Sequence, residues 1–186
     1  MPLVGTLMGL LLLSSSGVGI NPADNPLADS KPAFSVTLTG YNAVPGQTDG
    51  DPTHTANGGV ATPEVVAARS RDLADELPFG TVIALSHASS TDPSCGYDAV
   101  EPLIGYRVIT DTMNARFKSY VDVLLPVAAK VAYGAKQLPA SRVLGSCEGT
   151  TVTVVGHLDL TKVSSLPATQ ADLVALVESK GGLGLK

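Results

Sequence analysis

The chain has 186 residues and a mass of 18.9 kDa, which suits one domain with short tails. It carries a net charge of −5 with 12 Lys and Arg residues, and aromatic residues make up 4% of it. Nucleic-acid surfaces need clustered cations and, for single strands, stacking aromatic rings. The composition therefore excludes nucleic acid and polybasic membrane contacts. The 44% hydrophobic content argues against an intrinsically disordered chain.

An uncharged apolar run opens the chain, from Leu3 to Leu13, and small residues follow it. A membrane-spanning helix needs about 20 apolar residues, so the run fits a secretory signal peptide better. We expect a signal peptide over residues 1–20, a linker over residues 21–32 and export to the periplasm, cell envelope or extracellular space. The alternative is an apolar strand or helix of the folded domain. No stable membrane insertion of the mature chain is expected.

Short strands and turns dominate the rest of the sequence. Residues 33–41 alternate, with Phe34, Val36 and Leu38 on one face, which predicts a half-buried strand. A long polar loop rich in turn signals follows over residues 42–59. Further strands are predicted over residues 65–68, 81–85, 103–110, 119–125, 141–145 and 150–160. Helical segments are predicted over residues 71–77, 127–133 and 168–179. This order describes a small, mainly β barrel over residues 33–162, with a C-terminal helix and tail over residues 163–186.

Cys95 and Cys147 lie in loops rich in Gly and Ser, without the spacing of a metal site. In an exported protein we expect them to form a disulfide. Closing a loop of about 50 residues would stabilise the fold by roughly 4 kcal/mol on the chain-entropy model. Two free thiols in a cytosolic protein are the alternative. The three histidines stand apart from one another, so no metal is expected.

Two aspartates occupy apolar strands. Asp111 ends one predicted strand, and Asp122 interrupts another. A carboxylate there is costly unless it faces a groove or finds hydrogen-bond donors. Partial burial beside a second carboxylate raises one pKa and retains a proton at neutral pH, which is what protonating a glycosidic oxygen requires. The alternative is a solvated aspartate or one that caps a turn.

A series of motifs resembles the 3D (Asp-Asp-Asp) domain family. Asp111-Thr112 begins the second half of the pattern, Asp122 follows eleven positions later, and Tyr133-Gly134 precedes the last strand. The first half of the pattern matches residues 40–41, 55–58, 66–73 and 77–81. The match covers residues 34–160 and is similar to the C-terminal part of membrane-bound lytic transglycosylase A.

The resemblance implies a six-stranded double-psi β-barrel that cleaves peptidoglycan glycan strands between N-acetylmuramic acid and N-acetylglucosamine, without a cofactor. Asp122 would be the acid/base, and Asp111 and Asp72 would tune or position it. Thr55, Asn57 and Asn114 would bind the N-acetyl and hydroxyl groups of the substrate, although simple loop polarity explains these three equally well. Many relatives carry a Gly-rich segment after Asp-Thr, where this chain has Met113 to Lys118. We therefore expect a narrower or differently shaped groove.

Two other functions fit the same sequence. One is a non-catalytic cell-wall binding or scaffold module, since a fold does not fix a function. The other is a secreted domain that binds a protein partner through the loop of residues 42–59. The sequence leaves the oligomeric state open.

Overall fold

The computed structural model describes residues 32–48, 50–89, 91–162 and 166–179. The expected signal peptide, nearly all of the expected linker and the end of the chain lie outside the described residues. All described elements belong to the compact unit Lys31–Lys186. The strands are β1 (Ala33–Tyr41), β2 (Val66–Arg69), β3 (Thr81–Ser86), β4 (Arg107–Thr112), β5 (Tyr120–Leu124), β6 (Lys130–Tyr133), β7 (Lys136–Pro139) and β8 (Cys147–His157). The helices are α1 (Tyr97–Val100), α2 (Ala140–Leu144) and α3 (Gln170–Ser179), with 3-10 turns at Arg71–Leu73 and Glu101–Leu103.

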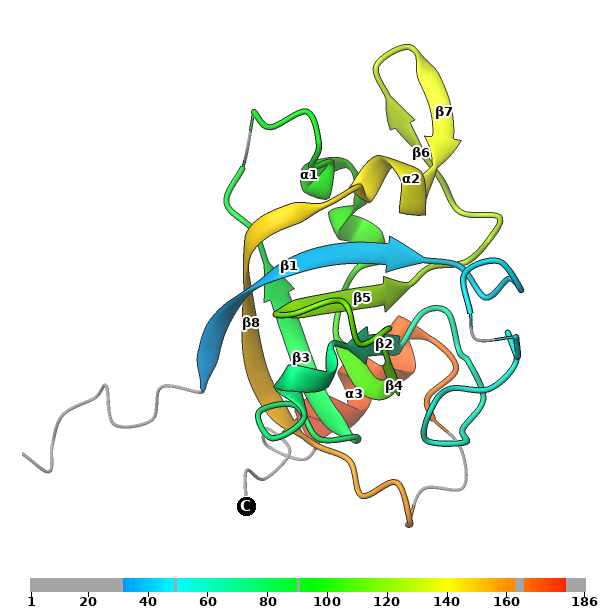
Figure 1. Cartoon of the computed structure of the whole chain (residues 1–186), viewed down its shortest axis with the longest axis vertical. Coiled ribbons are helices and arrows are strands. Elements are labelled where there is room, and N and C mark those ends of the chain that lie inside the picture. Colours follow the sequence, from blue (N-terminus) through cyan, green and yellow to red (C-terminus); the bar gives the residue numbers. More distant parts are fainter. Residues whose placement is uncertain (1–31, 49, 90, 163–165, 180–186) are drawn as a thin grey trace, which may run out of the picture. The chain divides into compact units, whose positions relative to one another are not determined.

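Six strands within the described ranges close into a barrel in the order β1-β5-β2-β4-β3-β8 (Figure 1). The pairs β1–β5 and β2–β4 are parallel, and the other four pairs are antiparallel. The first strand therefore lies between β8 and β5, and its pairing with β8 closes the ring. This arrangement confirms the mainly β class and the barrel that the strand patterns predicted.

The strands bury side chains on both of their faces. In β1, Val36 and Leu38 belong to one apolar cluster, whereas Tyr41 belongs to a second cluster on the other face. Helix α3 packs against this second cluster through Leu173 and Val177. The helix predicted over residues 168–179 is therefore confirmed as α3, and it covers one face of the barrel sheet.

The predicted helix over residues 127–133 is wrong. Strands β6 and β7 form an antiparallel hairpin instead, with Val131 opposite Leu138. Gly134, which directly follows the predicted helix, adopts a φ of 60° in the hairpin turn. Helix ends and hairpin turns both place glycine at positive φ, so the glycine alone did not distinguish the two structures.

The predicted strand over residues 141–145 is also wrong, because Ala140–Leu144 forms helix α2. A short apolar run fits a strand or a buried helix equally well. Here Pro139 precedes the helix and Gly145 follows it at a φ of 61°. The predicted strand over residues 103–110 begins later than expected, at Arg107, because Glu101–Leu103 forms a 3-10 turn.

A disulfide joins Cys95 and Cys147, as predicted. It links the segment before α1 to the first residue of β8. An isolated bridge between Cys95 and Gly145 and a hydrogen bond from the Gly96 amide to the Leu144 carbonyl lie beside it. Figure 1 shows α1, α2 and the β6–β7 hairpin gathered at the same end of the barrel, where these elements contact one another.

Candidate functional site

The strand register brings Asp111 and Asp122 into one row across the barrel wall. Ala68 in β2 is the direct partner of Asp111 in β4 on one side and of Asp122 in β5 on the other. Thr39 in β1 is in turn the partner of Asp122. Directly opposed residues share a face of the sheet, and two strand spacings place the two aspartate Cα atoms roughly 10 Å apart. The small Ala68 side chain is all that the sheet places between them.

A β-bulge in β4 turns Asp111 toward this row. Ala67 pairs with Ile109, and the next residue of β2, Ala68, pairs with Asp111, so Thr110 has no opposing residue. Without the extra residue, Asp111 would share the face of Ile109, which packs in the first apolar cluster. Bulges redirect side chains in this way and occur often beside functional sites.

Asp111 accepts three hydrogen bonds. The Tyr41 hydroxyl donates to Oδ2 at 2.9 Å, and the Ala56 and Thr112 amides donate to Oδ1 at 2.9 and 2.8 Å. The Tyr41 side chain is 8% exposed, and burial, followed by the charge of Asp111, raises its pKa. The phenol therefore remains a hydrogen-bond donor throughout the neutral range.

Asp122 has a different environment. It lies between Val121 and Val123, both fully buried, and its own Oδ1 is buried without a hydrogen-bond partner. The residue as a whole is partly accessible. Burial raises the pKa of this carboxyl group to about 7; the Thr39 hydroxyl acts in the opposite direction and the Asp111 charge in the same one. Asp122 is therefore protonated in a large fraction of molecules at neutral pH.

We expect the ionisation of Asp122 to govern part of the pH dependence of stability. Its pKa of about 7 in the folded state, against 3.8 ordinarily, means that the folded state binds the proton more tightly. Asp122 therefore leaves the folding stability unchanged below about pH 4. As the pH rises from 4 to 7, its ionisation lowers the stability by up to about 4 kcal/mol. The amide introduced by Asp122→Asn cannot ionise. Denaturation at pH 4 and pH 8 should therefore show Asp122→Asn gaining stability over wild type only at the higher pH.

The exposed Asp75 provides the matched control. Asp75→Asn should follow the wild-type pH dependence. If Asp122→Asn tracks wild type in the same way, the carboxyl group ionises normally and this account of Asp122 is wrong.

Asp72 lies apart from the other two aspartates. It is exposed, and its Oδ2 accepts the Ser119 amide at 2.9 Å, before β5 begins. Its slight burial would raise its pKa, but hydrogen bonds from Ser70 and Ser119 outweigh this and lower it. The Asp111 charge is among the influences on the pKa of Asp122, whereas Asp72 is not among them. The structure thus brings together two of the three predicted aspartates.

The predicted substrate-binding side chains fall into two groups. The Thr55 hydroxyl donates to Asn57 Oδ1 at 2.6 Å, and this pair shapes the turn whose Ala56 amide contacts Asp111. Asn57 also lines a cavity of about 540 Å³ together with Phe79 and His157. Asn114 is exposed between β4 and β5, where its Oδ1 accepts the Arg116 amide. Thr55 and Asn57 therefore lie beside Asp111, whereas Asn114 supports its own turn.

Sequence reasoning missed Tyr41 and Thr39 as members of the site. The alternation of residues 33–41 did contain the signal, because Thr39 and Tyr41 follow Ser35 and Thr37 on the face opposite Val36 and Leu38. What the pattern did not contain was the parallel pairing with β5, which sets Thr39 beside Asp122.

Comparisons with family models, curated proteins and solved structures found no match to this chain. In the described ranges, no helix is long and apolar enough to cross a membrane. The same part of the chain contains no group of three or more His, Cys, Asp or Glu side chains placed to hold a metal ion.

Proposed function

We propose that this protein is an exported lytic transglycosylase that cleaves peptidoglycan glycan strands with Asp122 as its acid/base. The observation that carries the proposal is the environment of the Asp122 carboxyl group. One of its oxygens is buried without a hydrogen-bond partner, and only Ala68 separates it from Asp111 across the sheet. Its pKa of about 7 suits a group that must both give and take a proton at neutral pH. On this proposal the barrel is of the double-psi type of the 3D family.

The proposed reaction uses one carboxyl group in two steps. Protonated Asp122 donates to the glycosidic oxygen as the bond to C1 of the muramyl residue breaks and an oxocarbenium-like centre forms. The carboxylate then accepts the proton of the muramyl 6-hydroxyl, whose oxygen forms the new bond to C1. The products are a 1,6-anhydromuramyl end and a free N-acetylglucosamine hydroxyl, and Asp122 is protonated again. No water is consumed, so a second catalytic carboxylate is unnecessary.

Asp111 and Tyr41 would act as positioning residues in this scheme. The three donors around Asp111 suit a carboxylate, and the Asp111 charge disfavours a second negative charge at Asp122. Asp122, which has fewer hydrogen-bond donors around it, then keeps the proton that it must give to the glycosidic oxygen.

The absence of a salt bridge to either aspartate in the described part of the chain favours catalysis over a purely structural or binding role. Among the described residues, the ion pairs are His54–Asp51 and Lys162–Asp159, and neither involves Asp111 or Asp122. A non-catalytic wall-binding module would show the two aspartates exposed or salt-bridged. Export is supported by the disulfide, because such bonds persist in oxidising compartments.

Digestion of purified sacculi tests the proposal directly. We expect wild-type protein to release muropeptides with 1,6-anhydromuramyl ends, detected by mass spectrometry as a loss of water relative to hydrolytic products. Reducing ends would indicate a hydrolase instead. Sacculi that are bound without any cleavage would support the wall-binding alternative and contradict the catalytic proposal.

Asp111→Asn is expected to shift the pH optimum of cleavage toward acid. Removing the neighbouring negative charge lowers the pKa of Asp122, so its protonated form persists only to lower pH. The amide oxygen still accepts from Ala56 and Thr112, which limits the disturbance of the fold. Rate profiles between pH 4 and pH 9 measure the shift, and an unchanged or alkaline-shifted optimum would contradict the assigned role of Asp111.

A further inference from the structure

A second concave site, the α1 cavity, lies beside the disulfide and away from the two aspartates. It has a volume of about 340 Å³ and is lined mainly by the segment that leads into α1, with contributions from β6 and from His87 after β3. Small-molecule sites range upward from about 300 Å³. The α1 cavity therefore has room for about one ring of a ligand.

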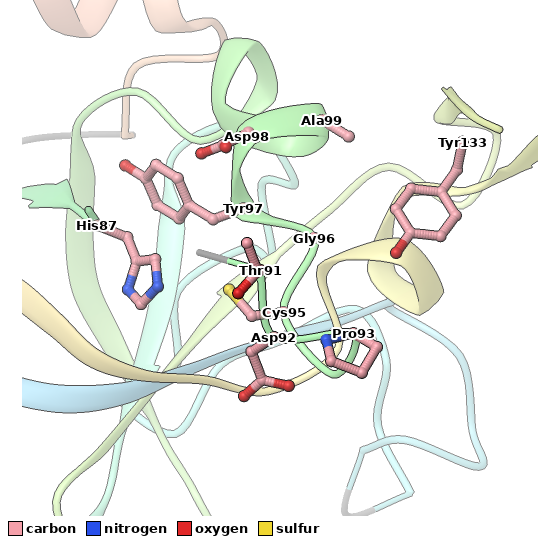
Figure 2. Close-up of a pocket in the computed structure, with 10 residues that line it drawn as sticks. All are labelled: His87, Thr91, Asp92, Pro93, Cys95, Gly96, Tyr97, Asp98, Ala99 and Tyr133. Atoms are coloured by element: carbon pink, nitrogen blue, oxygen red, sulfur yellow. The ribbon is translucent and has the colours of Figure 1, made fainter. Parts of the chain in front are cut away.

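Aromatic side chains stand on two sides of this cavity. Figure 2 shows His87 and Tyr97 on one side and Tyr133 on the other, with the Cys95–Gly96 segment between them. His87 and Tyr97 pack together with ring centroids 5.6 Å apart, and the Tyr97 hydroxyl donates to the Leu85 carbonyl. Tyr133 is 44% exposed. The cavity thus has one fixed aromatic wall and one accessible ring that can stack on a flat, partly apolar ligand.

The charged groups of the lining are carboxylates, which only accept hydrogen bonds. Asp92 and Asp98 contribute carboxylates, and Thr91 contributes a hydroxyl, while the lining residues include neither Lys nor Arg. Hydrogen bonds from Ser94 to Asp92 lower the pKa of that carboxyl group. Carboxylates accept hydrogen bonds and repel anions. These groups suit a neutral ligand with several hydroxyl donors and disfavour a phosphate or a carboxylate.

The cavity wall is held in place before any ligand arrives. The disulfide fixes Cys95 to β8, and the Gly96 amide donates to the Leu144 carbonyl at 3.1 Å. A side chain at position 96 would meet the Val143 carbonyl at 2.2 Å, so this segment packs directly on α2. Such preorganisation reduces the ordering cost of binding.

We propose that the α1 cavity binds one pyranose ring of a glycan, with the ring face on Tyr133 and its hydroxyl groups on Asp92 and Asp98. An accessible single ring opposite two acceptors fits a sugar, whose faces are apolar and whose edges carry donors. A cage for a cation would need several open ring faces, and here Tyr97 packs against His87 and is only 6% exposed. The choice of an N-acetylglucosamine-containing glycan rests on the proposed function.

Titration of the full chain with N,N′-diacetylchitobiose, followed by amide NMR shifts, tests this site. Saturable shifts are expected around Gly96 and Tyr133. Tyr133→Ala should weaken the affinity at least tenfold, equivalent to about 1.4 kcal/mol, whereas Tyr133→Phe retains the ring and should bind within about twofold of wild type. Asp98→Ala should weaken binding severalfold. Val127→Ala, which alters an exposed side chain outside the cavity, should change nothing.

Two results would overturn the assignment. One is the absence of saturable shifts in wild type, and the other is binding that is equally strong in Tyr133→Ala. Choline binding that depends on Tyr133, in a protein that ignores chitobiose, would identify a cation site instead. The proposed function fails separately: a wild-type protein that binds chitobiose through Tyr133 but leaves sacculi intact retains this site and loses the catalytic proposal. Conversely, a wild-type protein that cleaves sacculi but does not bind chitobiose would support the proposed function and contradict the glycan site in the α1 cavity.

Discussion

Asp122→Asn is expected to abolish release of 1,6-anhydromuropeptides from sacculi. The amide keeps the size of the carboxyl group but cannot donate a carboxylic proton, and general acid catalysis contributes about 10²–10⁴-fold. Unfolding would not explain the loss, because replacing a buried carboxyl group of raised pKa stabilises the protein at pH 8. Initial rates measured by mass spectrometry on the same sacculi, with circular dichroism as a check of folding, give the comparison.

The exposed Asp75 again offers the matched control. Asp75→Asn makes the same chemical change outside the row of Thr39, Asp122, Ala68 and Asp111, and it should cleave as fast as wild type. An Asp122→Asn protein that releases anhydromuropeptides at the wild-type rate would remove Asp122 from the mechanism.

Arg107→Met is expected to destabilise the fold by about 3–5 kcal/mol. Arg107 is fully buried, and its guanidinium donates to five carbonyls from three segments of the chain. These acceptors are the carbonyl oxygens of Pro63, Val66, Leu103, Ile104 and Leu124. Burial lowers its pKa to about 10, so it remains charged at neutral pH. Each buried acceptor left without a partner costs about 1–3 kcal/mol, and relief from burying the charge offsets part of the sum.

Urea denaturation measures this change as a lower midpoint at constant slope. Arg107→Lys should also be destabilising, since one ammonium group cannot reproduce the planar fork of donors. The exposed Arg142 in α2 supplies the control, and Arg142→Met should remain within about 0.5 kcal/mol of wild type. A loss below about 1 kcal/mol in Arg107→Met would show that the carbonyls find other partners.

The sequence predicted the strands best where side chains alternate between two environments. Strand β1 spans the predicted residues 33–41, because its alternation is clear and the turn signals after it are dense. The errors fall on short segments, as in α2 and the β6–β7 hairpin, where apolar residues and a glycine suit more than one structure. Arg107 lies inside a predicted strand. The sequence around it does not indicate that its guanidinium would be buried and would donate to five backbone carbonyls.

The candidate site was predictable in residue type and not in arrangement. Aspartates within apolar strands are costly, and this argument drew attention to Asp111 and Asp122. Their roles as acid/base and tuning group came only from the family resemblance. Their placement on either side of Ala68 depends on the pairing of β2 with both β4 and β5 and on the bulge at Thr110. Strand pairing and the bulge depend on residues far apart in the sequence. The spacing of eleven residues between Asp111 and Asp122 therefore does not determine how the two side chains are placed.

The closure of the barrel by its first and last strands has a consequence for biogenesis. Phe34 pairs with Val152, so β1 acquires this neighbour only after nearly the whole domain has been synthesised. Pairings so distant in sequence make folding slow, because the entropy of closing a long loop is lost before the contacts form. A chain that threads an export channel must stay unfolded until it has crossed. Under the proposed export, late ring closure would keep this chain in such a state during synthesis. The bond between Cys95 and Cys147 would then form only after the chain had crossed the membrane, where an oxidant is present.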